Sequence, residues 1–470
     1  MKKFVLAVFA VGCLAQTPAQ APAPKVTAAS LKADVSFLAS DAMEGRATPS
    51  KTLDIAAEFI ASEYRRAGLE PAGDDGYFQT ANFESVKPNL EGLELTLTIG
   101  GKKIKVDPGA VLLRQQSAAT LSEAEVVRVS GSDLASLSAD KIRGKALVVE
   151  GSARINAATN AAALIIVIAN QAPAAGPVRA ALRDASAAPS ATIMQVWDPA
   201  VREALLAAKD APVTVTARVP AAATEPVKLK NVIGLLRGSD AALKDTYLIL
   251  SAHYDHLGVR ATGEGDRIYN GADDDASGTA SLIEIAEALS ASPVRPKRTI
   301  VFLAHFGEEV GEIGSLYYVQ HPIFPIEKTI ANVNLEQLGR TDDSEGPKVG
   351  MFNMTGYTFT NMASVFEPAA RESGVSAVND EKSSDSYFGR SDNAKYANVG
   401  IPSTTISVAY MFPDYHAVGD EWPKLDYENM AKVDNAIALA ALRLANSADE
   451  PQWNKDNPRT AQYRQAREKR

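Results

Sequence analysis

Apolar residues recur along this chain with two different spacings. Continuous apolar runs that end abruptly in polar residues are typical of buried strands. Apolar residues at every third or fourth position are typical of helices with one buried face. The first pattern predicts strands at 247–252, 299–304, 330–335 and 401–408, and the second predicts helices at 30–39, 53–67, 280–289 and 427–445. Strands that alternate with helices in this way predict an α/β fold with a mostly parallel mixed sheet sandwiched by helices.

The segment between residues 108 and 226 differs in composition from the rest of the chain. It is rich in alanine, contains strand-like runs such as 163–168, and carries no histidine. This shift predicts an inserted, small β-rich domain that does not carry the chemistry. The main domain would then consist of residues 25–107, which end in a β-hairpin at 93–106, and residues 227–449. Residues 450–470 are polar and basic and are expected to fray as a tail.

The N-terminus has the features of an export signal. Two lysines precede a short apolar stretch, so residues 1–22 are expected to be a signal peptide, too short to span a membrane. Cys13 is the only cysteine, so the chain can form no internal disulfide. A lipid anchor at Cys13 is the alternative to a soluble exported product. The expected location is periplasmic or extracellular. The net charge of −9, with no long basic run before the tail, gives no support for nucleic-acid binding.

Polar residues follow the predicted strands at the ends where α/β sheets bind ligands. His253 and Asp255 follow the first strand, Glu308 and Glu309 the second, and Glu336 the third. An acidic run, Asp273 to Asp275, precedes the helix at 280–289, and His416 lies in a late loop. Carboxylates gathered this closely repel one another unless a cation binds between them. Because no thiolate is available, the nitrogen and oxygen ligands suit zinc, with manganese or cobalt as alternatives.

Five short motifs occur in a fixed order along the chain. They are His253-x-Asp255, the run Gly271 to Gly278, Glu308-Glu309 with Gly314-Ser315, Asn334-x-Glu336 with Gly339, and Tyr415-His416 with Asp420. Together they resemble the co-catalytic dizinc aminopeptidase family, which includes bacterial leucyl aminopeptidases and, as inactive relatives, transferrin receptors. The resemblance runs from about Ala28 to Ala445 and implies the zinc exopeptidase fold. Residues 108–226 are placed like the protease-associated domain that many members carry as an insert.

The resemblance also implies a role for each matching residue. Asp274 would bridge two Zn²⁺ ions, His253 and Glu336 would complete the ligands of one ion, and Glu309 and His416 those of the other. Glu308 would be the general base, and Asp255 would orient the imidazole of His253. Two positions depart from the family: Glu336 stands where many members have Asp, and Asn393 where relatives often have His. The implied activity is that of an exported zinc-dependent metallopeptidase, an aminopeptidase acting on peptides with a free N-terminus.

The same scaffold is compatible with other functions. A glutaminyl cyclase or a carboxypeptidase-type exopeptidase would use the same scaffold, and a receptor-like binding protein would use it without catalysis.

His256, His305 and His321 match no motif and are interpreted as satisfied or surface histidines. Asp273 and Asp275 are interpreted as acids that shape the loop and cap the following helix.

Overall fold

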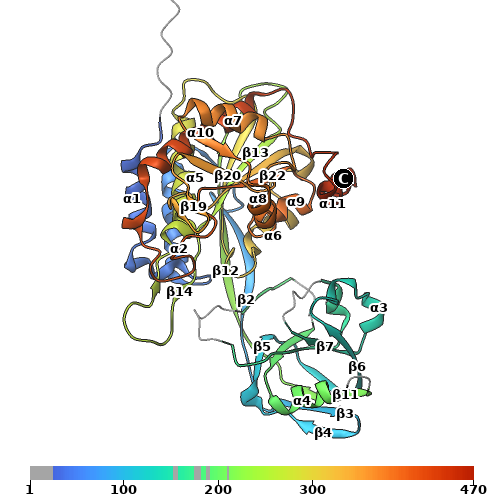
Figure 1. Cartoon of the computed structure of the whole chain (residues 1–470). Coiled ribbons are helices and arrows are strands. Elements are labelled where there is room, and N and C mark those ends of the chain that lie inside the picture. The colour runs from blue at the N-terminus through green and yellow to red at the C-terminus, as the bar shows by residue number, and fades with distance from the viewer. Residues whose placement is uncertain (1–24, 152–156, 174–180, 187–190, 209–210, 470) are drawn as a thin grey trace, which may run out of the picture.

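The protein has two parts of different architecture (Figure 1). The structure, a computed structural model, describes residues 25–151, 157–173, 181–186, 191–208 and 211–469. The larger part holds the main sheet and most of the helices. The smaller part is mostly β and is joined to it through the long strands β2 (Phe78–Lys87) and β12 (Ala223–Leu236). The predicted signal peptide and Cys13 lie outside the described residues, within which no helix has the length and apolar content to cross a bilayer.

The main sheet has ten strands and is parallel at its centre. The four central strands are β22 (Ser403–Ser407), β17 (Thr329–Leu335), β13 (Tyr247–His253) and β16 (Thr299–His305), and neighbours among them run parallel. Beyond β16 lie β12, β2 and β9 (Ala181–Asp184), all in antiparallel pairs, and β1 (Glu70–Pro71) pairs with β12. Beyond β22 lie β20 (Met351–Met354) and β21 (Ser376–Val378). The predicted α/β fold with a mixed sheet is confirmed.

Helices cover both faces of this sheet. Side chains of a strand alternate between faces, so Leu248 and Leu250 of β13 pack into one apolar core and Ile249 into the other. The first core includes residues of α1 (Ala28–Leu38), α2 (Lys51–Arg66), α5 (Gly278–Ser290), α7 (Ala363–Glu372) and α10 (Tyr427–Asn446). The second includes residues of α6 (Ile313–Gln320) and α9 (Asn393–Asn398). Burial on both faces explains why the strands are continuous apolar runs, and it fixes their carboxyl ends at one edge.

The inserted β-rich part begins earlier than the predicted boundary at residue 108. The predicted hairpin exists as β3 (Glu94–Ile99) and β4 (Lys102–Lys105), but β3 pairs with β11 (Val213–Val219) of the insert. The complete sheet of the insert adds β5 (Val111–Gln115), β6 (Ala119–Ser130), β7 (Ala146–Glu150), β8 (Leu164–Ile168) and β10 (Thr192–Val196). Conversely, β9 lies within 108–226 but joins the main sheet. The boundary was wrong because the sequence of a hairpin does not reveal which sheet it will join.

The C-terminal segment is folded, and the prediction of a fraying tail was wrong. Residues Ala461–Glu468 form α11, and the rings of Trp453 and Tyr463 stack with their centroids 4.9 Å apart. Trp453 also packs with Phe359 and Phe388 in a small apolar cluster. The polar composition of this segment concealed two aromatic side chains that anchor it to the main domain.

Candidate metal centre

Loops at one edge of the main sheet bring the predicted residues together. His253 is the last residue of β13, Glu308 and Glu309 follow β16, and Glu336 follows β17 directly. Asp274 lies in the turn Ala272–Ser277 before α5, and His416 lies in the loop after β22. The parallel register of β13, β16 and β17 puts their carboxyl ends side by side, which is where such sheets place their sites.

Asp274 lies at the centre of this cluster. Its Oδ1 is 3.4 Å from His253 Nε2, and its Oδ2 is 3.0 Å from His416 Nε2. The two oxygens of one carboxylate therefore face two different histidines, as a carboxylate that bridges two ions would. Ligand atoms of His253, Asp274 and Glu336 all lie within 4.8 Å of one another and form the first group that could hold a metal.

A second group contains a histidine that the sequence interpretation set aside. It consists of His256, Asp274 and Glu309, whose ligand atoms also lie within 4.8 Å of one another. His416 joins this group, with Nε2 3.3 Å from Glu309 Oε1. His256 is buried, so it is not a surface histidine, and its Nδ1 is 2.8 Å from the same oxygen, which places it within this cluster. The available signal was its position, three residues after His253 in the same strand-end loop.

The remaining two histidines agree with the interpretation as satisfied or surface residues. His305 is buried, and its ring nitrogens contact the Tyr396 hydroxyl at 2.9 Å and Asn231 Oδ1 at 3.2 Å. His321 is exposed and stacks on Tyr317. Neither residue belongs to the two ligand groups.

Asp255 positions more than the imidazole of His253. His253 Nδ1 lies 3.1 Å from the backbone oxygen of Asp255 and 3.5 Å from its carboxylate. The carboxylate itself accepts a hydrogen bond from the backbone N–H of Glu308 at 3.0 Å and another from the Thr48 hydroxyl at 2.9 Å. The imidazole is therefore oriented mainly through a carbonyl, while the carboxylate of Asp255 fixes the loop that carries Glu308.

Burial and mutual repulsion control the charges of the acids. Burial raises the pKa of Glu308 well above its usual value, and the Glu336 and Glu309 carboxylates add to this against an opposing effect of His253. Burial also raises the pKa of Glu336 to about 7. Burial favours the neutral form of Asp274 as well, yet His253 and His416 hold the pKa of Asp274 well below its usual value. The protein alone therefore does not keep all these acids ionised, and a bound cation would do so.

The aspartates beside Asp274 hold its turn in place. The Asp273 carboxylate accepts hydrogen bonds from the backbone N–H groups of Gly339 at 2.6 Å and Arg340 at 3.1 Å. The Asp275 carboxylate accepts from Gly278 at the start of α5, as a cap would, and from Gln337 in the loop after β17. Asp420 accepts from the backbone N–H groups of Asp273 and Asp274. Both flanking aspartates thus tie the turn to the loop after Glu336, which goes beyond the predicted capping.

Arg46 is a buried cation beneath this cluster that the sequence did not reveal. Its guanidinium donates to the carbonyl oxygens of Tyr254 at 2.9 Å, Leu38 at 2.5 Å, Asn270 at 2.8 Å and Gly271 at 2.9 Å. Burial lowers the pKa of Arg46 to about 10, while the carboxylates of Asp255 and Asp275 oppose that effect. Arg46 therefore joins the N-terminal helices to both loops that carry candidate ligands.

We expect Arg46→Met to destabilise the fold strongly. The substitution removes the guanidinium donor from four buried carbonyl groups, although that of Gly271 keeps a hydrogen bond from the Ala276 N–H. It also removes a charge that compensates buried acids, so the free energy of unfolding should fall by about 3–5 kcal/mol. Urea unfolding at a fixed zinc concentration measures this. The control is Arg66→Met, because the Arg66 side chain is 55% exposed in a surface ion pair, and its loss should cost no more than about 1 kcal/mol. Equal stability of the two variants would contradict the role of Arg46.

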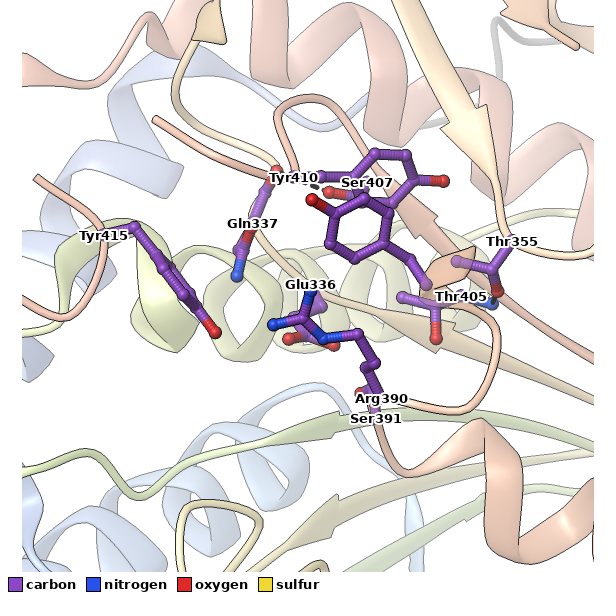
Figure 2. Close-up of a pocket in the computed structure, with 10 residues that line it drawn as sticks. Glu336, Gln337, Thr355, Arg390, Ser391, Thr405, Ser407, Tyr410 and Tyr415 are labelled. Carbon is purple, nitrogen blue, oxygen red and sulfur yellow. Dashed lines mark hydrogen bonds between the residues drawn. The ribbon is translucent and has the colours of Figure 1, made fainter. Parts of the chain in front are cut away.

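Two cavities adjoin the cluster. The first is small and is lined by Glu336 together with Tyr387, Arg390, Tyr410 and Tyr415 (Figure 2). The Arg390 guanidinium lies over the Tyr387 ring, 4.8 Å from its centroid. The second, of about 740 Å³, lies between the insert and the main domain and is lined by residues 112–117 and 181–183 as well as by Glu309. The candidate ligands are therefore accessible both from a small pocket and from a larger groove.

The residues of the cluster fit zinc. Ligand atoms of a tetrahedral zinc site lie about 3.3 Å apart, since each bond to nitrogen or oxygen is about 2.0–2.1 Å long. The contacts of Asp274 with His253 and His416, at 3.4 Å and 3.0 Å, are close to that spacing. Within the described residues His253 Nε2 is buried without a hydrogen-bond partner, as expected of a nitrogen aimed at an ion. The sheet thus presents two groups of nitrogen and oxygen ligands that share one carboxylate, and each group could hold a metal ion.

Comparison with known proteins finds a family match within the main domain. Residues 231–441 match the sequence model of Peptidase family M28, so this part of the chain is similar to the peptidases of that family. A probable zinc metalloprotease from Pyrenophora teres is 34% identical over 122 residues, which are 26% of this chain and 25% of that protein. The uncharacterised protein YfbL from Escherichia coli is 28% identical over 237 residues, 45% of this chain and 70% of its own length. The match to the Pyrenophora relative thus spans about a quarter of that protein.

Solved structures show the same fold. An aminopeptidase from Aneurinibacillus sp. strain AM-1 superposes with a TM-score of 0.56 at 21% identity, covering 92% of this chain and 97% of that one. BSAP, a zinc aminopeptidase from Bacillus subtilis, superposes with a TM-score of 0.52 at 20% identity, covering 90% and 96%. The coverage includes the inserted β-rich part, so the architecture as a whole is shared with these proteins.

Proposed function

We propose that the protein is a zinc-dependent aminopeptidase that holds two zinc ions per chain. The observation that carries the proposal is the position of Asp274, whose two carboxylate oxygens face His253 and His416 separately. His253 and Glu336 would hold one ion with Asp274, and Glu309 and His416 the other. The M28 match and the fold shared with zinc aminopeptidases support the proposal.

The chain's own groups would supply the proton transfers. Zinc bound in such a site lowers the pKa of a coordinated water and polarises a carbonyl group. Glu308 would accept a proton from the attacking water and deliver it to the leaving amine, because its carboxyl interacts with those of Glu309 and Glu336 and burial raises its pKa well above the usual value. The Asp255 carboxylate would keep Glu308 in place through its backbone N–H.

A carboxypeptidase-type exopeptidase is the second candidate, favoured by Arg390. This cation lines the pocket that also contains Glu336, and a guanidinium is well suited to bind a substrate carboxylate. A glutamate carboxypeptidase 2 homolog from Caenorhabditis elegans is 34% identical over 114 residues, which are 23% of this chain and 13% of that protein. The pocket is therefore compatible with recognition of either end of a peptide.

Zinc analysis followed by a panel of end-blocked peptides tests the proposal. The purified protein should contain two zinc ions per chain and release the first residue of peptides with a free α-amine. Acetylation of that amine should abolish hydrolysis, while amidation of the C-terminus should leave it unchanged. The opposite pattern would identify the carboxypeptidase-type activity, and turnover of glutaminyl peptides to cyclic products would identify a glutaminyl cyclase. Less than one metal per chain, with no activity after zinc is added, would overturn all three in favour of a binding protein.

The proposal extends to location and to the insert. The apolar N-terminal segment supports export of the chain, with a lipid anchor at Cys13 as the alternative form. The groove between the insert and Glu309 supports a role for the insert, a protease-associated domain by its position in the chain, in guiding substrate to the ligands.

A further inference from the structure

His256 enters the cluster from an unexpected position. It follows the last residue of β13 by three positions, and its side chain is about 1% exposed. Its backbone N–H donates to the carbonyl of Arg46 at 3.2 Å, and the adjacent Ala47 forms a β-bridge with it. The backbone contacts of His256 therefore fix the loop that carries the ring, and the ring is buried in the cluster.

The ring nitrogens of His256 have no ordinary partner. In the part of the chain that the structure describes, neither Nδ1 nor Nε2 makes a hydrogen bond, although both are buried. Nδ1 lies 2.8 Å from Glu309 Oε1 and 4.0 Å from Asp274 Oδ2 without hydrogen-bond geometry. A buried polar nitrogen without a partner costs about 1–3 kcal/mol, so a specific reason is expected for it. Atoms that surround a common ion lie close to one another without the geometry of hydrogen bonds, as these do.

An ion pair between His256 and Glu309 explains the arrangement less well. A protonated imidazole carries a second N–H at Nε2, and that buried nitrogen also lacks an acceptor among the described residues. The loop is in addition shaped around this ring: a Cβ on Gly271, whose φ is +60°, would lie 2.4 Å from His256 Cγ. Gly271 thus allows the imidazole to approach the turn that carries Asp274.

We propose that His256 Nδ1 is a further metal ligand, shared with Asp274, Glu309 and His416, so that the two ions of the proposed zinc centre are held unequally. One ion would then have four protein ligands, and the other only three, from His253, Asp274 and Glu336. Four-ligand zinc sites are closed and structural, whereas three-ligand sites keep a position open for water or substrate. The inference rests on the proposed function and deepens it, because it assigns the tightly held ion to the His256 side and substrate contact to the His253 side.

Counting the ligating histidines tests this directly. In the Co²⁺-substituted protein, each imidazole bound to the metal gives one strongly shifted, exchangeable N–H resonance in the proton NMR spectrum. Three such resonances are expected in the wild type, from His253, His256 and His416, and two in His256→Ala. Two resonances in the wild type would overturn the inference, and this spectrum decides the question even if the variant fails to fold.

Metal affinity provides the second measurement. After titration with graded chelators, His256→Ala should lose one zinc at a chelator strength at least tenfold lower than the wild type, because even an outer partner of a ligand costs 10–100-fold in affinity. The control is His321→Ala, since His321 is exposed directly after α6 and lies outside both ligand groups. Unchanged retention of both ions by His256→Ala would overturn the inference and leave the proposed function intact. Absence of bound metal in the wild type would instead overturn the proposed function.

Discussion

Asp274→Ala is expected to remove both metal ions. Because Oδ1 faces His253 and Oδ2 faces His416, this single carboxylate belongs to both ligand groups, and its removal takes a ligand from both ions at once. Elemental analysis should find the zinc content falling from two ions per chain to less than one, with peptide hydrolysis at the detection limit. The control is Asp245→Ala, an exposed acid before β13, which should keep both the metal and the activity.

The same substitution should change how stability depends on metal. A ligand that binds only the native state at 100 times its dissociation constant stabilises that state by about 2.7 kcal/mol. Chelation should therefore lower the melting temperature of the wild type and leave that of Asp274→Ala nearly unchanged. A variant that retains two zinc ions and responds to chelator as the wild type does would contradict the bridging role of Asp274.

The strands that carry the cluster were predictable because they are buried on both faces. β13, β16 and β17 are continuous apolar runs, and their parallel pairing places the residues that follow them at one edge. The end of such a strand, which can be located in the sequence, therefore predicts the position of a candidate ligand. His253 and Glu336, at and just after the ends of β13 and β17, were predictable on this ground.

His256 and Arg46 were not predictable because their roles depend on tertiary contacts. His256 follows a strand end, but only the approach of Glu309 from the next strand turns it into a ligand candidate. Arg46 lies in a polar loop, where an exposed arginine would be ordinary, and it becomes buried because carbonyl groups from three distant segments converge on it. Neither convergence leaves a periodic signal in the chain.

The boundary of the insert was misplaced for a related reason. β3 and β4 have the alternation of any hairpin, and nothing local distinguishes a hairpin of the main domain from one of the insert. Pairing with β11, more than a hundred residues later, makes the choice: Val215 pairs with Leu97 and Ala217 with Leu95, and all four side chains lie in the core of the insert. Pairing between distant strands decides such boundaries, so composition alone located the insert only approximately.

Glu308→Gln is expected to abolish most turnover while both metals stay bound. Glu308 belongs to neither ligand group, and its backbone N–H is held by the Asp255 carboxylate, so the isosteric amide leaves the loop in place. A general base contributes typically about 10²–10⁴-fold to the rate, and kcat should fall by that factor with the zinc content unchanged. Glu327→Gln, an exposed acid on the surface, should keep full activity.

The pH dependence of the residual activity separates a proton-transfer role from a structural one. Burial raises the pKa of Glu308, so the wild type should gain activity as the pH rises through that value and the carboxylate forms. Glu308→Gln has no group to ionise there, and its residual activity should lose this acidic limb. A merely structural Glu308 would instead leave the pH profile of the variant parallel to that of the wild type. Near-wild-type turnover in Glu308→Gln would show that another group accepts the proton and that the role proposed for Glu308 is wrong.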